Sequence, residues 1–175
     1  MLRSTEAGRK SRDEFIAYTQ NWARMPAADA RLVVTAPWAS DDEHPSHSLP
    51  ALAGAKLAAT YGSDVEDAFH RAMFKAYFAE NRTISDTDVI TAIALASGVD
   101  ATEFADRYRA EESELGDQVI SDHNDAVRLG INAVPTIIVD DRISIPGAQE
   151  TATYIQVIEQ LLRERDTLDA DPLDH

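Results

Sequence analysis

Apolar residues recur at helical spacing through most of this chain. The pattern predicts helices over about residues 12–26, 51–61, 64–80, 85–97 and 100–129, with a closing helix over 150–165. In one of these segments Val65, Phe69 and Met73 lie four residues apart and therefore share one helix face. Such a stripe has to be covered by neighbouring helices, so the pattern predicts a domain of several packed helices.

Two segments break the helical pattern. Arg31–Thr35 is a short extended run that Pro37 stops, and Val134–Val139 is a β-branched run too short for a helix. After the second run, Asp140 and Asp141 are typical turn residues, and Ile143–Ile145 alternates apolar with polar. We therefore predict an antiparallel hairpin over about residues 134–145, ended by Pro146 and Gly147.

Polar residues mark where several of these helices begin. Ser85 with Asp88, and Asp100 with Glu103, each resemble an N-cap with an acidic residue three positions later. Ser46 or Ser48 is expected to cap the helix that runs from Ala51. His70 lies beside Phe69 and Met73, where we expect a hydrogen-bonded core histidine rather than a ligand.

Charge and composition narrow the classes of function. The 175 residues carry a formal net charge of -15, which repels phosphate backbones and anionic lipids, so we predict no nucleic-acid partner and no membrane partner. No apolar run is long enough to span a bilayer. The first ten residues are polar and basic without an apolar stretch behind them, so a cytoplasmic location is expected.

Few residues carry candidate chemistry of their own. The chain has no cysteine, which removes disulfides, thiolate nucleophiles and cysteine-ligated zinc. His44 and His47 stand three apart in a proline-containing loop, which aims imidazole rings poorly, so we predict no metal site. Ser46, Thr136 and Ser144 have no matched base that spacing can assign, so no catalytic residue and no cofactor are predicted.

The order of elements in the second half resembles a known family. Gly130-Ile131, Val134-Pro135-Thr136, Ile145-Pro146-Gly147-Ala148-Gln149 and Tyr154 are similar to the C-terminal half of DsbA-like proteins of the thioredoxin superfamily. Upstream, Phe69-His70, Ala76-Tyr77-Phe78 and Ile84-Ser85-Asp86-Thr87-Asp88-Val89 extend the resemblance over roughly residues 45 to 160. Within that family the chain resembles the FrnE-like and 2-hydroxychromene-2-carboxylate isomerase-like branch.

This resemblance implies a fold and a site. The fold would be α/β and thioredoxin-like, with a large helical insertion, predominantly helical, and with an incomplete N-terminal β-α-β portion. In the family the proline of the Val-Pro-Thr motif is cis and faces the active site, and Pro135 matches it. The resemblance therefore implies that Val134, Pro135 and Thr136 bind substrate, with the backbone of Val134 free to pair with an extended segment.

The departures from the family matter as much as the agreement. The family begins with a strand that leads to Cys-x-x-Cys at a helix N-terminus, and neither the cysteines nor that strand can be found here. We expect the following organisation, in chain order: a disordered leader at 1–11, a remnant of the thioredoxin portion at 12–48, a helical domain at 49–130, a ββα portion at 131–165 and an acidic tail at 166–175.

Three functions stay open at this level. The first is a DsbA-family protein related to thiol-disulfide oxidoreductases, itself redox-inactive, which retains a surface for a peptide or protein substrate. The second is a glutathione-dependent isomerase or transferase of the same fold, in which Val134 would contact the tripeptide. The third is a non-enzymatic module that forms a homodimer to complete its sheet.

Overall fold

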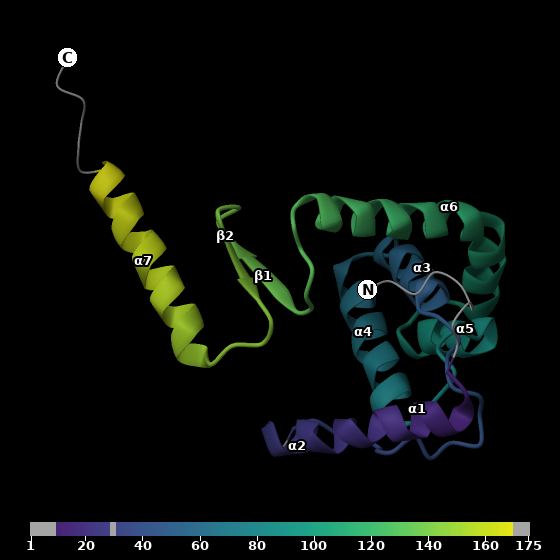
Figure 1. Ribbon diagram of the computed structural model, residues 1–175. Helices are drawn as coiled ribbons and strands as arrows, with labels where there is room; N and C mark the ends of the chain where they lie inside the picture. The colour runs from purple at the N-terminus through teal and green to yellow at the C-terminus, as the bar shows by residue number, and fades with distance from the viewer. Residues whose placement is uncertain (1–9, 29–30, 170–175) are drawn as a thin grey trace. The chain divides into compact units, whose positions relative to one another are not determined.

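The computed structural model describes residues 10–28 and 31–169 (Figure 1). The chain divides into two compact units. The first, here called the helical unit, ends at Asp125, and the second, the hairpin unit, begins at Ala126. Each unit is described by itself below.

The helical unit opens with a run of three short helical segments. These are α1 (Arg12–Thr19), a 3-10 turn (Gln20–Arg24) and α2 (Met25–Ala28). Ser11 begins α1 with a full capping box: its hydroxyl accepts from the N–H of Glu14, whose carboxylate accepts from the N–H of Ser11. These hydrogen bonds from Ser11 lower the pKa of Glu14.

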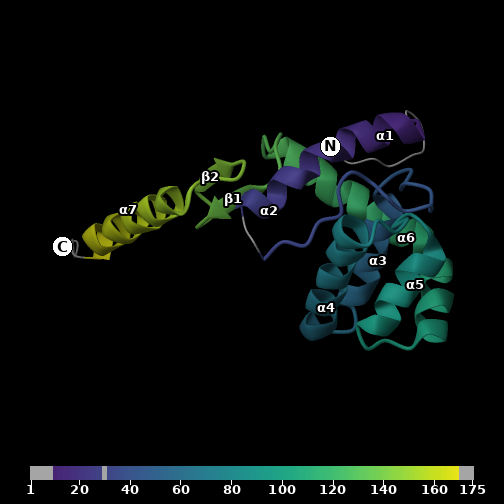
Figure 2. The same ribbon diagram turned by 90° about the horizontal axis from the view of Figure 1, so that it is seen from below.

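Four longer helices form the body of the helical unit. They are α3 (Leu49–Ala59), α4 (Ser63–Phe74), which continues into a π-helical turn (Lys75–Ala79), α5 (Thr87–Ala96) and α6 (Ala101–Arg128), whose residues up to Asp125 belong to this unit. Helices α3, α4 and α5 lie side by side in both views (Figures 1 and 2). The apolar stripes that the sequence predicts are therefore covered by one another, as amphipathic helices require.

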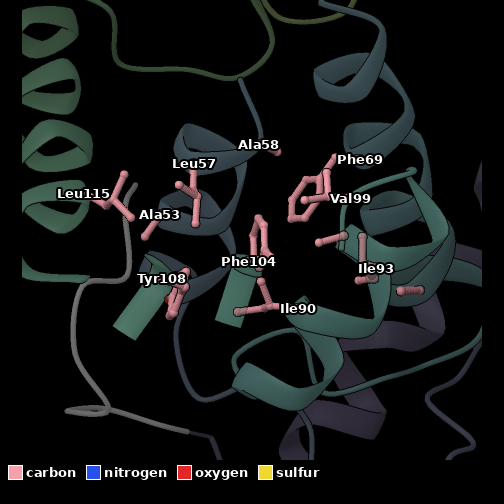
Figure 3. Close-up of a cluster of buried hydrophobic side chains, with 12 residues drawn as sticks. Ala53, Leu57, Ala58, Phe69, Ile90, Ile93, Val99, Phe104, Tyr108 and Leu115 are labelled. Atoms are coloured by element: carbon pink, nitrogen blue, oxygen red, sulfur yellow. The ribbon is translucent and has the colours of Figure 1, made fainter. Parts of the chain in front are cut away.

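The main core lies between these helices. Figure 3 shows Leu57 from α3, Phe69 from α4, Ile90 from α5, and Phe104 and Tyr108 from α6 converging on one apolar cluster. Phe104 is central to this cluster. The centroid of its ring lies 6.0 Å from the ring centroid of Phe69 and 6.2 Å from that of Tyr108. Burial of such large side chains stabilises the fold by roughly 1.5–3 kcal/mol each.

A second, aromatic cluster anchors the N-terminal segment. Phe15, Trp22 and Trp38 are buried together, with Tyr77 and Phe78 packed against them. Polar contacts fix the same region, since the Trp38 N–H donates to Thr19 Oγ1 at 2.8 Å. The predicted extended run Arg31–Thr35 belongs to neither strand of the structure. The Thr35 N–H instead donates to the carbonyl of Phe78 at 2.8 Å.

The hairpin unit contains β1 (Thr136–Val139), β2 (Ile143–Pro146) and α7 (Thr151–Asp169). The two strands pair antiparallel, with Ile137 opposite Ile145. The hairpin predicted from the β-branched run and the two aspartates is therefore confirmed. The closing helix is also confirmed, although it runs to Asp169, into the residues that we assigned to an acidic tail.

Two predictions about individual residues were wrong, those for Ser85 and His70, and the predicted N-cap position of Ser48 was confirmed. The N-cap of α5 is Asp86 rather than Ser85, because the Asp86 carboxylate accepts from the N–H of Asp88. Ser48 holds the N-cap position of α3 but makes no side-chain capping bond there. His70 is exposed, because it follows Phe69 on α4 and one residue turns it about 100° away from the core. The leader expected at residues 1–11 lies mostly outside the described residues.

Helix length and apolar character do not coincide in this chain. Helix α6 has 28 residues but is strongly charged, whereas the apolar helices α3 and α5 have 11 and 10 residues. Among the described residues, no helix is both long and apolar enough to cross a membrane.

A substitution at Gly54 tests how tightly the main core is packed. A Cβ at this α3 position would lie 2.7 Å from Ile90 Cγ2 and 3.2 Å from Phe69 Cζ. We expect Gly54→Ala to lower the free energy of unfolding by about 1–2 kcal/mol in urea titrations, because overpacking outweighs the gain in helix propensity. Gly116→Ala is the control, since its Cβ would meet only Leu49 at 3.9 Å and should stabilise α6. Equal effects at both sites would contradict this packing.

The buried phenol of Tyr108 predicts a loss of stability at alkaline pH. Burial, with a smaller contribution from the Glu112 carboxylate, raises the pKa of Tyr108 to about 12, whereas an unfolded tyrosine titrates near 10. The unfolded state therefore loses this proton first, so stability should fall as the pH rises from about 10 to 12. In denaturant titrations across this range, Tyr108→Phe should lose less stability than the wild type. Parallel curves would contradict the assignment.

Candidate functional site

The segment that leads into β1 is the most exposed apolar part of the hairpin unit. The Val134–Pro135 peptide bond is cis, and the Val134 side chain is 83% exposed. Thr136 is half-buried, and its hydroxyl donates to the carbonyl of Ala133 at 2.6 Å, which closes a tight turn before the strand. The structure thus presents Val134 at the surface next to a strand of fixed conformation.

The register of the hairpin decides which backbone groups of β1 stay open. The Gly147 N–H donates to the carbonyl of Pro135 at 2.7 Å, which makes positions 135 and 147 a hydrogen-bonded pair. Hydrogen-bonded and non-hydrogen-bonded pairs alternate along an antiparallel ladder. The backbone N–H and C=O groups of Ile137 and Val139 therefore also point toward β2. The N–H and C=O groups of Thr136 and Ile138 therefore point to the opposite edge.

The two edges of the hairpin are not equivalent. Within the part of the chain that the structure describes, β1 and β2 pair only with each other, so each has an open edge. On β2 the outward positions are Ser144 and Pro146, and proline has no N–H to donate. The edge of β1 offers N–H donors at both Thr136 and Ile138, which makes it the better template for an added strand.

The turn and the closing helix hold the hairpin in place. Asp140 and Asp141 both have positive φ, 55° and 51°, as a tight hairpin turn requires. The next residue, Arg142, donates to the Glu164 carboxylate of α7 at 3.0 Å. A hydrogen bond from Gln160 and this bond from Arg142 lower the pKa of Glu164. At the start of α7, the Gln149 N–H donates to Tyr154 Oη at 3.1 Å.

Helix α7 buries less of its apolar surface than the sequence predicts. The spacing of the apolar residues predicts an inward face of Ala152, Ile155, Ile158, Leu161 and Leu162, but of these only Leu161 is buried. Ile155, Ile158 and Leu162 lie at i, i+3 and i+7 and are exposed by 50%, 47% and 43%. They form a continuous stripe on one side of α7, here called the α7 stripe.

The loop histidine His44 proves to be a packing residue. It is buried and stacks on Phe15, with ring centroids 4.3 Å apart, while its Nε2 lies 2.9 Å from the carbonyl oxygen of Lys10. Such contacts explain its burial without any ligand. No group of three or more histidine, cysteine or carboxylate residues in the described ranges is arranged to hold a metal ion.

Sequence reasoning singled out Val134, Pro135 and Thr136 but missed two residues that shape the same site. Gly147 fixes the register through its bond to Pro135, and Ile138 supplies an outward N–H and an exposed side chain. No motif points to Ile138, because the outward direction of its N–H follows only from the register of the paired strands.

The helical unit and the cis-proline hairpin together define a class of protein. A comparison with family models finds a match to the DSBA-like thioredoxin domain over residues 34–159. The match covers most of the chain, so this protein belongs to the DSBA-like thioredoxin domain family. Its fold is the helix-rich form of that domain, with a small two-stranded antiparallel sheet, which confirms the predicted fold class.

The groups at this site are backbone amides and apolar side chains. The sequence contains no cysteine, so no thiolate can form at this surface. What it presents are backbone N–H and C=O groups on β1 and the exposed side chains of Val134 and Ile138. Groups of this kind bind an extended polypeptide by adding a strand to the sheet.

Proposed function

We propose that the hairpin unit binds an extended segment of a peptide or protein along the open edge of β1. Val134, Pro135 and Thr136 would form the substrate-binding site together with Ile138. The observation that carries this proposal is the register, which turns the N–H and C=O groups of Thr136 and Ile138 away from β2. The exposed Val134 adjoins that edge and supplies an apolar contact.

The energy available at such an edge is modest. Each backbone hydrogen bond to an added strand contributes about 0.5–1.5 kcal/mol net, and Thr136 and Ile138 can form up to four. The exposed side chains add apolar burial at roughly 25 cal/mol per Å². These terms have to offset the ordering of the bound segment, so we expect weak binding of many sequences rather than tight binding of one.

We further propose that the protein performs no thiol chemistry itself. It would stand in the FrnE-like branch of the family, as a chain without the Cys-x-x-Cys strand–helix unit. The absence of cysteine from all 175 residues supports this proposal. Substrate binding without thiol chemistry would then be what this chain retains of the family's function.

Proline substitutions distinguish the two edges of the hairpin. Ile138→Pro removes an outward N–H on β1, and Ser144→Pro removes the matching one on β2. With a permanently unfolded, S-carboxymethylated polypeptide as the probe, fluorescence anisotropy should show binding weakened roughly fivefold by Ile138→Pro, the equivalent of about 1 kcal/mol. Ser144→Pro should bind as the wild type does. Equal effects of the two substitutions would remove the β1 edge from the account.

The proposed redox inactivity is checked by reduction of insulin with dithiothreitol. Because the chain has no thiolate to attack a disulfide, added protein should leave the rate at its uncatalysed value. A DsbA-like protein that contains Cys-x-x-Cys serves as the positive control. Turnover above the background by this chain would refute the proposal.

The α7 stripe supports a second candidate function, a dimerising interaction module. Three aliphatic side chains exposed in a row on one helix are best covered by the same stripe of a second copy. Sedimentation velocity should show a monomer–dimer equilibrium that Ile158→Glu shifts to monomer. Gln156→Glu, an equal change of charge at an exposed position of α7, should leave the equilibrium unchanged. A wild-type protein that stays monomeric at all concentrations would rule this function out.

A further inference from the structure

A polar cavity of about 380 Å³ opens in the helical unit, between two segments that are distant in the sequence. Its walls come from the loop before α3 and from the start of α5 with the segment before it. The lining residues are Glu43, His44, Ser46, His47, Thr83, Ser85, Asp86, Thr87 and Asp88. The Thr83 hydroxyl joins the two walls by donating to the carbonyl of Glu43. The Ser46 N–H joins them again, through a bond to Ser85 Oγ at 3.3 Å.

One hydroxyl in this cavity is held against a base. Ser46 Oγ lies 2.7 Å from His47 Nδ1, although Ser46 itself is only 6% exposed. In the His47 tautomer that carries its hydrogen on Nε2, the Ser46 hydroxyl donates to Nδ1, which is a contact that a nucleophile makes with its general base. Spacing alone gave Ser46 no base, because adjacent residues seldom face each other in this way.

The groups around this pair restrict the substrate. Glu43, Asp86 and Asp88 line the cavity, and their carboxylates repel anions. Thr87, the first residue of α5, also lines the cavity. A neutral ester avoids the repulsion by these carboxylates.

We propose that Ser46 and His47 form an acyl-transfer site for small, neutral carboxylic esters, with Ser46 as nucleophile and His47 as general base. Ser46 Oγ attacks the ester carbonyl while its proton passes to His47 Nδ1. The bond to the leaving alkoxide breaks, and the alkoxide takes that proton and departs as the alcohol. Water then attacks the acyl-serine, again giving a proton to His47, and the acid and the free hydroxyl are released. This inference is independent of peptide binding by the hairpin unit.

The test uses p-nitrophenyl acetate and the full-length chain. The wild type should release p-nitrophenol at least tenfold faster than Ser46→Ala or His47→Gln, and the acetyl group should map to Ser46 by mass spectrometry. Ser121→Ala and His70→Gln remove an exposed hydroxyl and an exposed imidazole outside the cavity, and both should react as the wild type does. Acetylation spread over lysines and tyrosines, or equal rates for all five proteins, would overturn the proposal.

Labelling of the unmodified protein avoids any loss of folding in the variants. Diisopropyl fluorophosphate should modify Ser46 in the native wild type, and urea should abolish that modification, because reactivity depends on the His47 contact. No modification of the native protein, or the same modification in urea, would also overturn the proposal.

Discussion

The hydrogen bond from the Gly147 N–H to the carbonyl of Pro135 fixes the register of the two strands of the hairpin. This bond is 2.7 Å long and makes positions 135 and 147 a hydrogen-bonded pair. Because hydrogen-bonded and non-hydrogen-bonded pairs alternate in an antiparallel ladder, it also determines which backbone groups further along β1 point toward β2. A slip of one residue would exchange the inward and outward backbone groups and would also turn Ile145 out of its buried position. The burial of Ile145 and the open edge of β1 are therefore two consequences of one register.

The helical unit has a different constraint, the close approach of α3 to its neighbours at Gly54. Only a residue without a side chain lets Ile90 and Phe69 contact the α3 backbone there, and Phe69 in turn contacts Phe104. The aromatic cluster of Phe15, Trp22 and Trp38 then ties the N-terminal segment to the π-helical turn after α4, through Tyr77 and Phe78. Packing of this kind keeps the loop before α3, and with it Ser46 and His47, in a defined position.

Much of this fold could be predicted from the sequence, for reasons that particular residues make plain. The stripe through Val65 and Phe69 and the β-branched run before Asp140 are strong local signals, so α4 and the hairpin were found. Residues whose role depends on contacts distant in the sequence were not predicted correctly. His70 follows Phe69 in the sequence but is exposed to solvent. The extended run that ends at Thr35 pairs with no strand, and the Thr35 N–H donates instead to the carbonyl of Phe78.

The residues of the candidate site were likewise only partly predictable from the sequence. The sequence motif identified Val134, Pro135 and Thr136 as site residues. The outward direction of the Ile138 N–H could not be predicted in this way, because it depends on the register of the paired strands. The α7 stripe was misassigned because periodicity identifies an apolar face without revealing whether anything covers it.

The central claim is that one edge of β1 is open and receives an added strand. Hydrogen exchange of single amides, followed by NMR, tests it most directly. We predict slow exchange at Ile137 and Val139 and fast exchange at Thr136 and Ile138 in the free protein. Exchange at Thr136 and Ile138 should slow when an unfolded polypeptide is added. Uniform protection along β1, or outward amides that the polypeptide leaves unchanged, would contradict it.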